Sequence, residues 1–552
     1  MKRLGAVILP MLTLALTSCD FSFHFSGFSY SSSSSSYSEE SYPSLSTSMS
    51  EEGEGYYRPS SVNENINFYK IGKCNEEALL PSKGKFHLLV LPIEFSDCPF
   101  GESRLNDIRT AFSGSSEDTR YWESLESFYE KSSYGKLDFE FTFADPCVLA
   151  RTPMEWFNQN KDKTAKPGTR FRDAPEMMGQ LALQSAVRNY KNNTGDDCLK
   201  FDSDDDGFID ACLMIYSCHD SSASRREANP YYPEITDKNT YGSLFWAFQY
   251  TDQSSPTGNL LSPVGNRYFW ASYDFFYEGV KEGQGVDAHT LIHETGHILG
   301  TDDYYNYANN ETANPCGNLM MMAANILDHD SFTKMTFGWT SPYVATGDTE
   351  IVLHPFESTG ECLLLADSWN GTSYDEYVLF ELYTPTGLNE LDANNSYSGK
   401  QGYSRPGIIA YHIDARLVKA RSFSEDGVAQ ASEFLTDAEV QNFETTAKKA
   451  RDRGYYIVPG TTNTAHYDAS LIQNRGYELI QLIQSGGRYT LRRGGDADDS
   501  DLFHKGDSFS INTHYAFFPE APQMNNGERL PFEVYFEEVN GEYAKLVVTK
   551  KA

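Results

Sequence analysis

Five residues of this 552-residue chain fall in a spacing that suits hydrolytic metal chemistry. His293, Glu294 and His297 form the pattern His-Glu-x-x-His, and Gly300 and Asp303 follow it. Residues four apart share one face of a helix, so two imidazoles can bind one ion while the glutamate lies beside them. Glycine lets the chain leave the helix and turn the aspartate back as a third ligand. The spacing predicts a zinc site with His293, His297 and Asp303 as ligands and Glu294 as the base.

The alternative is that these are ordinary polar residues on an amphipathic helix. Typical residue frequencies give a chance of about one in a hundred for His-Glu-x-x-His in a chain of this length, and roughly one in ten thousand once the glycine and aspartate are required. The full pattern therefore favours a metal site.

The extended pattern resembles that of the metzincin peptidases, with aspartate in place of their commoner third histidine. It is more closely similar to the immune inhibitor A family of secreted bacterial metalloproteases, and residues 287–292 and 302–305 share that likeness. The resemblance covers roughly residues 85–414. It implies a methionine in a tight turn beneath the metal, for which this chain offers Met322, or Met321 as the alternative.

The resemblance implies a zinc-dependent endopeptidase that hydrolyses peptide bonds of extracellular proteins or peptides. Zinc would acidify a water molecule, and Glu294 would take its proton during attack on the peptide carbonyl and return it to the leaving amine. Two other functions stay open: an inactive or latent protease-like protein for surface binding or adhesion, and a zinc amidase acting on cell-wall or glycan-linked peptides. The intact Glu294 and ligand set favour the peptidase over the first alternative but do not separate it from the second.

A second acidic pattern lies upstream and suits calcium. It places carboxylates at positions 1, 3, 5 and 9 of a loop, namely Asp202, Asp204, Asp206 and Asp210. Gly207 stands at position 6, as calcium loops require, but Leu213 replaces the bidentate glutamate of a full EF-hand. Four crowded carboxylates repel one another unless a cation neutralises them. We therefore expect a calcium ion here, with a solvated acidic turn as the alternative.

The N-terminus predicts export and membrane anchoring. Residues 1–18 join a short basic start to an apolar stretch too short to span a bilayer, which is typical of a signal peptide. The residues before Cys19 match a bacterial lipobox, which predicts cleavage there and lipid attachment to its thiol. A plain secretory signal is the alternative. Residues 19–60 are rich in serine and predict a disordered tether, followed by a lead-in or pro-segment at 61–84. We therefore expect an extracytoplasmic protein held on a bacterial cell membrane by lipid.

The charge balance argues against one class of partner. The chain has 45 Lys plus Arg against 78 Asp plus Glu, a formal charge of −33, so nucleic-acid phosphates would be repelled. The sequence carries no sign of its oligomeric state, and a monomer is assumed. Eight cysteines accompany Cys19, an even number that permits disulfides without requiring them. Cys74 is interpreted as an ordinary cysteine rather than as an inhibitory zinc ligand.

The order of expected elements predicts an α+β fold. Hydrophobic periodicity predicts strand, helix, strand, helix and strand over residues 86–93, 121–131, 137–143, 174–190 and 211–216. The resemblance implies that, with the zinc helix, these elements form a metzincin-like catalytic domain of mixed sheet and helices over residues 85–345, which could extend to about 420. Short alternating runs between turn residues predict a β-rich, sandwich-like region over residues 346–552.

Two further features are interpreted as structural. The aromatic runs at 245–248 and 268–270 suit core strands better than a substrate platform. His412 and Asp414 lie close together on an expected strand, where such pairs usually have local hydrogen-bond partners. Neither feature is therefore expected to form a second active site.

Overall fold

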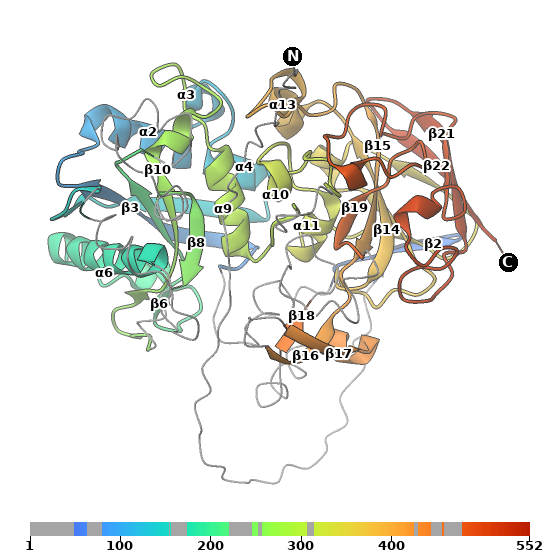
Figure 1. The fold of residues 1–552 in the computed structure, drawn as a ribbon, viewed down its shortest axis with the longest axis horizontal. Coiled ribbons are helices and arrows are strands. Elements are labelled where there is room, and N and C mark those ends of the chain that lie inside the picture. Colours follow the sequence, from blue (N-terminus) through green and yellow to red (C-terminus); the bar gives the residue numbers. More distant parts are fainter. Residues whose placement is uncertain are drawn as a thin grey trace, which may run out of the picture.

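The protein is a mixed α/β molecule with several mixed sheets and an all-antiparallel four-stranded sheet in its C-terminal part (Figure 1). This agrees in outline with the expected α+β class. The computed structural model describes residues 49–62, 80–153, 155, 174–219, 245–251, 257–305, 314–423, 429–442, 455–457 and 477–551. Cys19 and Cys74 lie outside these residues. No helix within them is both long enough and apolar enough to cross a bilayer.

The N-terminal half contains a sheet with the strand order β4-β3-β7-β10-β8, and β5 also pairs with β3. Its strands are β3 (Gly84–Phe95), β4 (Leu137–Phe143), β5 (Cys147–Leu149), β7 (Cys212–Tyr216), β8 (Phe248–Thr251) and β10 (Arg267–Ser272). All pairings are parallel except that of β8, which runs antiparallel to β10 at the edge of the sheet.

Helices cover both faces of this sheet, which explains why β3 reads as a continuous apolar run. Leu88 and Val90 of β3 belong to one core cluster, whereas Leu89 and Leu91 belong to another, because successive side chains point to opposite faces. The first cluster includes residues of α2 (Gly101–Ser113), α4 (Leu125–Ser132) and α9 (His289–Leu299), and the second includes residues of α6 (Ala174–Thr194).

The helix expected at residues 121–131 begins later than predicted, at Leu125. The physical reason is a capping box: the Ser124 side chain accepts from the backbone N–H of Ser127, and the Ser127 hydroxyl accepts from the backbone N–H of Ser124. The cap fixes the first turn of α4. Farther along this helix, the Tyr129 hydroxyl donates a hydrogen bond to the Ile292 carbonyl in α9 at 2.7 Å. This contact joins α4 to the helix that carries the histidines.

The C-terminal half contains two facing sheets. The seven-stranded sheet has the order β1-β2-β11-β13-β14-β15-β19, with β1 (Met49–Gly53), β2 (Tyr56–Pro59), β11 (Tyr343–Ala345), β13 (Cys362–Leu365), β14 (Glu376–Tyr383), β15 (Gly407–Asp414) and β19 (Ile480–Leu482). The four-stranded sheet has the order β12-β22-β21-β20, with β12 (Thr349–Leu353), β22 (Ala544–Lys550), β21 (Phe532–Val539) and β20 (Ser508–Ser510). Side chains from both sheets, such as Phe380 and Phe536, share one core cluster.

Residues 49–59 correct the expected extent of the tether, which was placed at residues 19–60. They form β1 and β2, and β2 pairs antiparallel with β11, almost 290 residues away in the chain. Aromatic packing stabilises this pairing, since the ring of Tyr56 lies edge-on to Tyr343 at 5.7 Å between centroids. The tyrosines at this end of the Ser-rich segment supply the apolar surface that the serines lack.

Shorter elements connect these sheets. They are α3 (Ser116–Thr119), α10 (Met321–Ala324), α11 (Ser331–Thr336), α12 (Phe356–Thr359), α13 (Glu390–Asn394), α14 (Asp437–Gln441), the β6 (Phe208–Ile209) and β9 (Val264–Gly265) pair, and the sheet of β16 (Val418–Phe423), β17 (Ala429–Phe434) and β18 (Tyr455–Ile457). Helices α9, α10 and α11 lie between the N-terminal sheet and the C-terminal sheets (Figure 1). One core cluster runs through this junction, from Leu88 to Tyr411.

The described residues contain seven cysteines, all buried and all with free thiols. They are Cys98, Cys147, Cys198, Cys212, Cys218, Cys316 and Cys362. The disulfides that the even cysteine count permits do not occur among these seven.

Candidate metal centre

Helix α9 carries two of the predicted ligands, and it ends at Gly300, where the sequence predicts that the chain leaves the helix. His293 and His297 are buried on it, and Gly300 follows in the left-handed conformation with φ of 103°. The backbone N–H groups of Gly300 and Thr301 donate to the carbonyls of His297 and Gly296. This tight cap reverses the chain, so that Asp303 returns to the two histidines.

Three ligand atoms meet at this point. Oδ1 of Asp303 lies 2.9 Å from Nε2 of His293 and 3.3 Å from Nε2 of His297, and the two Nε2 atoms are 3.2 Å apart. A tetrahedral ion with bonds of about 2.0–2.1 Å separates its ligand atoms by roughly 3.3 Å. The buried group of His293, His297 and Asp303 could therefore hold a metal ion.

Backbone carbonyls set the tautomers of both histidines. Nδ1 of His293 lies 2.9 Å from the carbonyl oxygen of Met321, and Nδ1 of His297 lies 3.1 Å from that of Thr301. A carbonyl only accepts, so each Nδ1 carries the hydrogen and donates it. Each neutral ring then presents the lone pair of Nε2 to the same point as the Asp303 carboxylate. Two lone pairs and a negative charge in one buried place fit a cation.

Protons and a metal ion compete for these atoms. Burial alone would lower the pKa of His297, but the Asp303 carboxylate outweighs burial and raises that pKa to about 9. Burial alone would raise the pKa of Asp303, but His297 and His293 outweigh it and hold that pKa well below its usual range. Metal affinity should therefore weaken in acid.

Glu294 lies beside this group without belonging to it. It is buried, and its Oε2 has no hydrogen-bond partner among the described residues. Burial raises the pKa of this carboxyl, and the nearby His297 and His293 only partly oppose that rise. A desolvated carboxylate next to a metal site is suited to accept a proton from water.

The methionine run contributes two different contacts. The sulfur of Met322 lies so close to Gly296, between the two histidines on α9, that a β-carbon at Gly296 would be 2.7 Å from it. Met321 offers its backbone carbonyl to His293 instead of its side chain. The methionine side chain that packs against Gly296 is therefore that of Met322, and its role as the methionine beneath the metal stays a prediction.

The upstream acidic loop brings together three of its four predicted ligands. Oxygens of Asp202, Asp204 and Asp210 lie within 4.8 Å of one another, whereas Asp206 is outside this group and accepts from the backbone N–H of Phe208. Burial raises the pKa of Asp210 to about 7. The loop therefore keeps the predicted convergence but not the full set of ligands.

His412 and Asp414 both have hydrogen-bond partners, as their interpretation as structural residues predicts. Nε2 of His412 lies 2.9 Å from Oε1 of Glu376, and Arg416 donates two hydrogen bonds to the Asp414 carboxylate at 2.7 and 2.8 Å. The aromatic residues Phe245 and Trp270 are likewise fully buried in the core.

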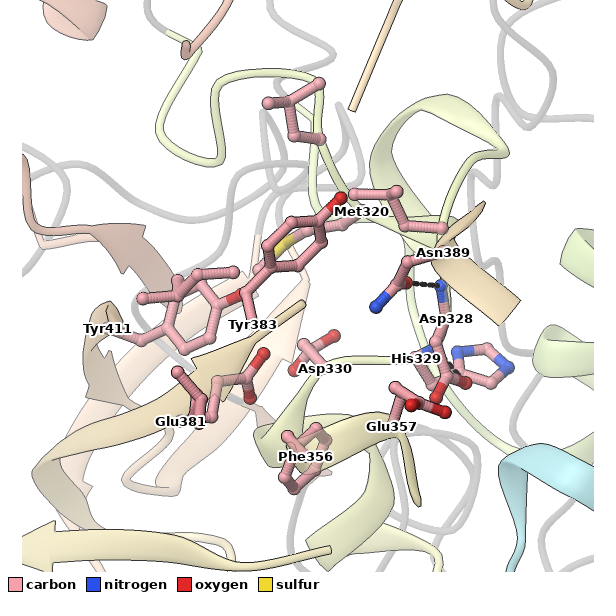
Figure 2. Close-up of a pocket in the computed structure, with 14 residues that line it drawn as sticks. Met320, Asp328, His329, Asp330, Phe356, Glu357, Glu381, Tyr383, Asn389 and Tyr411 are labelled. Carbon is pink, nitrogen blue, oxygen red and sulfur yellow. Dashed lines mark hydrogen bonds between the residues drawn. The ribbon is translucent and has the colours of Figure 1, made fainter. Parts of the chain in front are cut away.

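A small cavity is lined in part by Met320, the first residue of the methionine run. Figure 2 shows the residues that line it, including Met320, Asp328, Glu357 and Glu381. Its volume is about 20 Å³, which has room for about one water molecule. Burial raises the pKa of Glu381 to about 8. The lining of the cavity includes none of the three candidate metal ligands, so the cavity lies apart from the metal site.

The partners of His289, the first residue of α9, could not be predicted from the sequence. Its Nδ1 lies 2.6 Å from Asp287 and its Nε2 lies 3.3 Å from Asp392, far along the chain. Its ring is stacked between Trp122 at 3.9 Å and Tyr397 at 4.3 Å. The imidazole of His289, between two carboxylates and two aromatic faces, therefore joins the start of α9 to the C-terminal half.

Raising the pH above 6.5 is expected to weaken the fold through His289. Burial alone would lower the pKa of His289, but Asp287 and Asp392 raise it from 6.5 to about 9. A group whose pKa rises on folding stabilises the fold fully below its unfolded pKa and loses that contribution as the pH passes its folded pKa. The rise corresponds to roughly 3 kcal/mol. The Tm of the protein should fall more steeply between about pH 6 and pH 10 than that of His289→Gln; equal slopes would contradict this role.

Comparisons with known proteins assign no family to the chain. No model of a known protein family matches it, and no curated protein matches it significantly. The geometry of the site therefore carries the functional argument.

Proposed function

We propose that this chain is a zinc-dependent endopeptidase that cleaves extracellular proteins or peptides. The observation that carries the proposal is the convergence of two Nε2 lone pairs and Oδ1 of Asp303, with the unpartnered Oε2 of Glu294 beside them. The resemblance to the immune inhibitor A family, drawn from the motif, points to the same activity. His293, His297 and Asp303 would hold the zinc ion.

A bound zinc ion supplies Lewis-acid chemistry, since it polarises a carbonyl and lowers the pKa of water. Glu294 accepts the proton of the attacking water and returns it to the leaving amine. The carbonyls of Met321 and Thr301 hold the two imidazoles in the orientation that the ion needs. With these roles assigned, Glu294 is the only catalytic base in the proposal.

Strand β8 is the last strand of its sheet among the described residues, and it lies beside α9 (Figure 1). A zinc site with a glutamate base would serve a protein substrate or a cell-wall stem peptide alike, so the substrate test below includes both.

Two finer points belong to the same proposal. The set of two histidines and one carboxylate also occurs in non-haem iron centres, and the neighbouring Glu294 base favours zinc hydrolysis over iron chemistry. We also propose a calcium ion at Asp202, Asp204 and Asp210, whose carboxylates would otherwise repel one another. We also propose that the protein is exported and held at the cell surface by a lipid anchor at Cys19.

Removal and return of zinc tests the proposal. The purified protein should cut an unfolded, dye-labelled protein, lose this activity with a zinc chelator, and regain it with added zinc but not with calcium. Cleavage that survives chelation would contradict the zinc mechanism. Turnover of peptidoglycan peptides without protein cleavage would favour the amidase, and zinc binding without any cleavage would favour a binding or adhesion protein.

A further inference from the structure

We propose that Tyr305 is a positioning residue for the metal site, and this inference rests on the proposed function. Its hydroxyl donates to Oδ2 of Asp303 at 3.0 Å. The other oxygen of the same carboxylate, Oδ1, lies 2.9 Å from Nε2 of His293. The hydroxyl would therefore hold Asp303 with Oδ1 toward the metal and Oδ2 away from it.

Each of the three ligands has a second contact of this kind. The two histidines donate from Nδ1 to the backbone carbonyls of Met321 and Thr301, and Asp303 accepts from Tyr305. Of these contacts, only the one to Asp303 comes from a side chain. It can therefore be removed by one substitution while all three ligands are kept.

The hydroxyl has two chemical consequences for an aspartate ligand. A carboxylate can bind an ion through one oxygen or both, and a donor on Oδ2 favours binding through Oδ1 alone. This leaves coordination positions for water and substrate. The donor also draws negative charge toward Oδ2, which partly offsets the loss of Lewis acidity caused by an anionic ligand in place of histidine.

The neighbouring tyrosine explains how Tyr305 reaches this place. Tyr304 is fully buried, its backbone N–H donates to the Met322 carbonyl at 2.8 Å, and its hydroxyl lies 2.8 Å from that of Thr333 in α11. Tyr304 thus fixes the returning loop to the methionine segment and to α11. Tyr305, which is only partly buried, directs its hydroxyl back to Asp303.

Zinc affinity of two substitutions tests this role without reference to turnover. Competition with a chelating dye would measure the affinity of the unaltered protein, Tyr305→Phe and Tyr305→Leu. If the hydroxyl orients Asp303, both substitutions should weaken zinc binding by about 10- to 100-fold. If only the ring matters, Tyr305→Phe keeps full affinity while Tyr305→Leu loses it, and that result would overturn the proposal.

The visible absorption of the cobalt-substituted protein gives a second readout. Loss of the hydroxyl should allow both oxygens of Asp303 to bind, which raises the coordination number and weakens the cobalt absorption of Tyr305→Phe. An unchanged spectrum and affinity would overturn the role of Tyr305 while leaving the proposed function intact. If the unaltered protein binds no zinc, the proposed function fails and the inference fails with it.

Discussion

Replacing Glu294 with glutamine is expected to slow peptide hydrolysis by about 10²- to 10⁴-fold, the usual contribution of a general base. Glutamine keeps the size of the side chain but cannot accept the proton of water. Glu294 lies outside the ligand group, so the Glu294→Gln protein should keep its zinc. The measurement pairs the cleavage rate of an unfolded protein with the zinc content of the same sample.

Glu381→Gln is the matched control for this substitution. Glu381 is also a buried glutamate, and burial raises its pKa to about 8, so it is largely protonated at neutral pH and resembles glutamine. This control should cleave at the normal rate. Normal cleavage by Glu294→Gln, or an equal loss in both variants, would rule out Glu294 as the base.

Replacing Asp303 with asparagine is expected to weaken zinc binding by about 100-fold or more, beyond the range typical of second contacts to a ligand. The change removes the negative charge next to two Nε2 atoms, which lie 2.9 and 3.3 Å from Oδ1. Zinc at 100 times its dissociation constant stabilises a protein by about 2.7 kcal/mol. At that zinc concentration a 100-fold loss of affinity leaves only about 0.4 kcal/mol, so the rise in Tm on zinc addition should largely vanish in Asp303→Asn.

Asp302→Asn offers the same chemical change one residue away. Asp302 accepts from the backbone N–H of Asp303 through Oδ1, and an asparagine can keep that contact. Asp302→Asn should therefore retain zinc affinity and the rise in Tm. Equal losses in the two variants would mean that general charge, rather than the Asp303 ligand, governs metal binding.

The core of the candidate site could be predicted because its rules are local. Positions 293 and 297 share a helix face through the period of the helix, and Gly300 permits the left-handed cap that returns Asp303. Met322 was placed only by resemblance, but its sulfur lies against Gly296 on the same helix. Short-range geometry and a rare motif were sufficient for these residues.

The remaining features depend on contacts between distant parts of the chain. No periodicity around residue 56 indicates that β2 pairs with β11, and nothing beside His289 points to Asp392. The carbonyls that orient the histidines belong to the backbone, which any residue supplies, so no side-chain type marks them. Tyr305 stands only two positions after the ligand Asp303. The direction of its hydroxyl could not be predicted, because it depends on how Tyr304 packs.

Anomalous diffraction from crystals, recorded on both sides of the zinc edge, would test the central claim most directly. The proposal predicts a zinc peak enclosed by His293, His297 and Asp303, with bonds of about 2.0–2.2 Å to two nitrogens and one oxygen. The proposal would be contradicted by an iron signal at the same point. It would also be contradicted if crystals grown in zinc held no metal there and the two histidines were hydrogen-bonded to Asp303 instead.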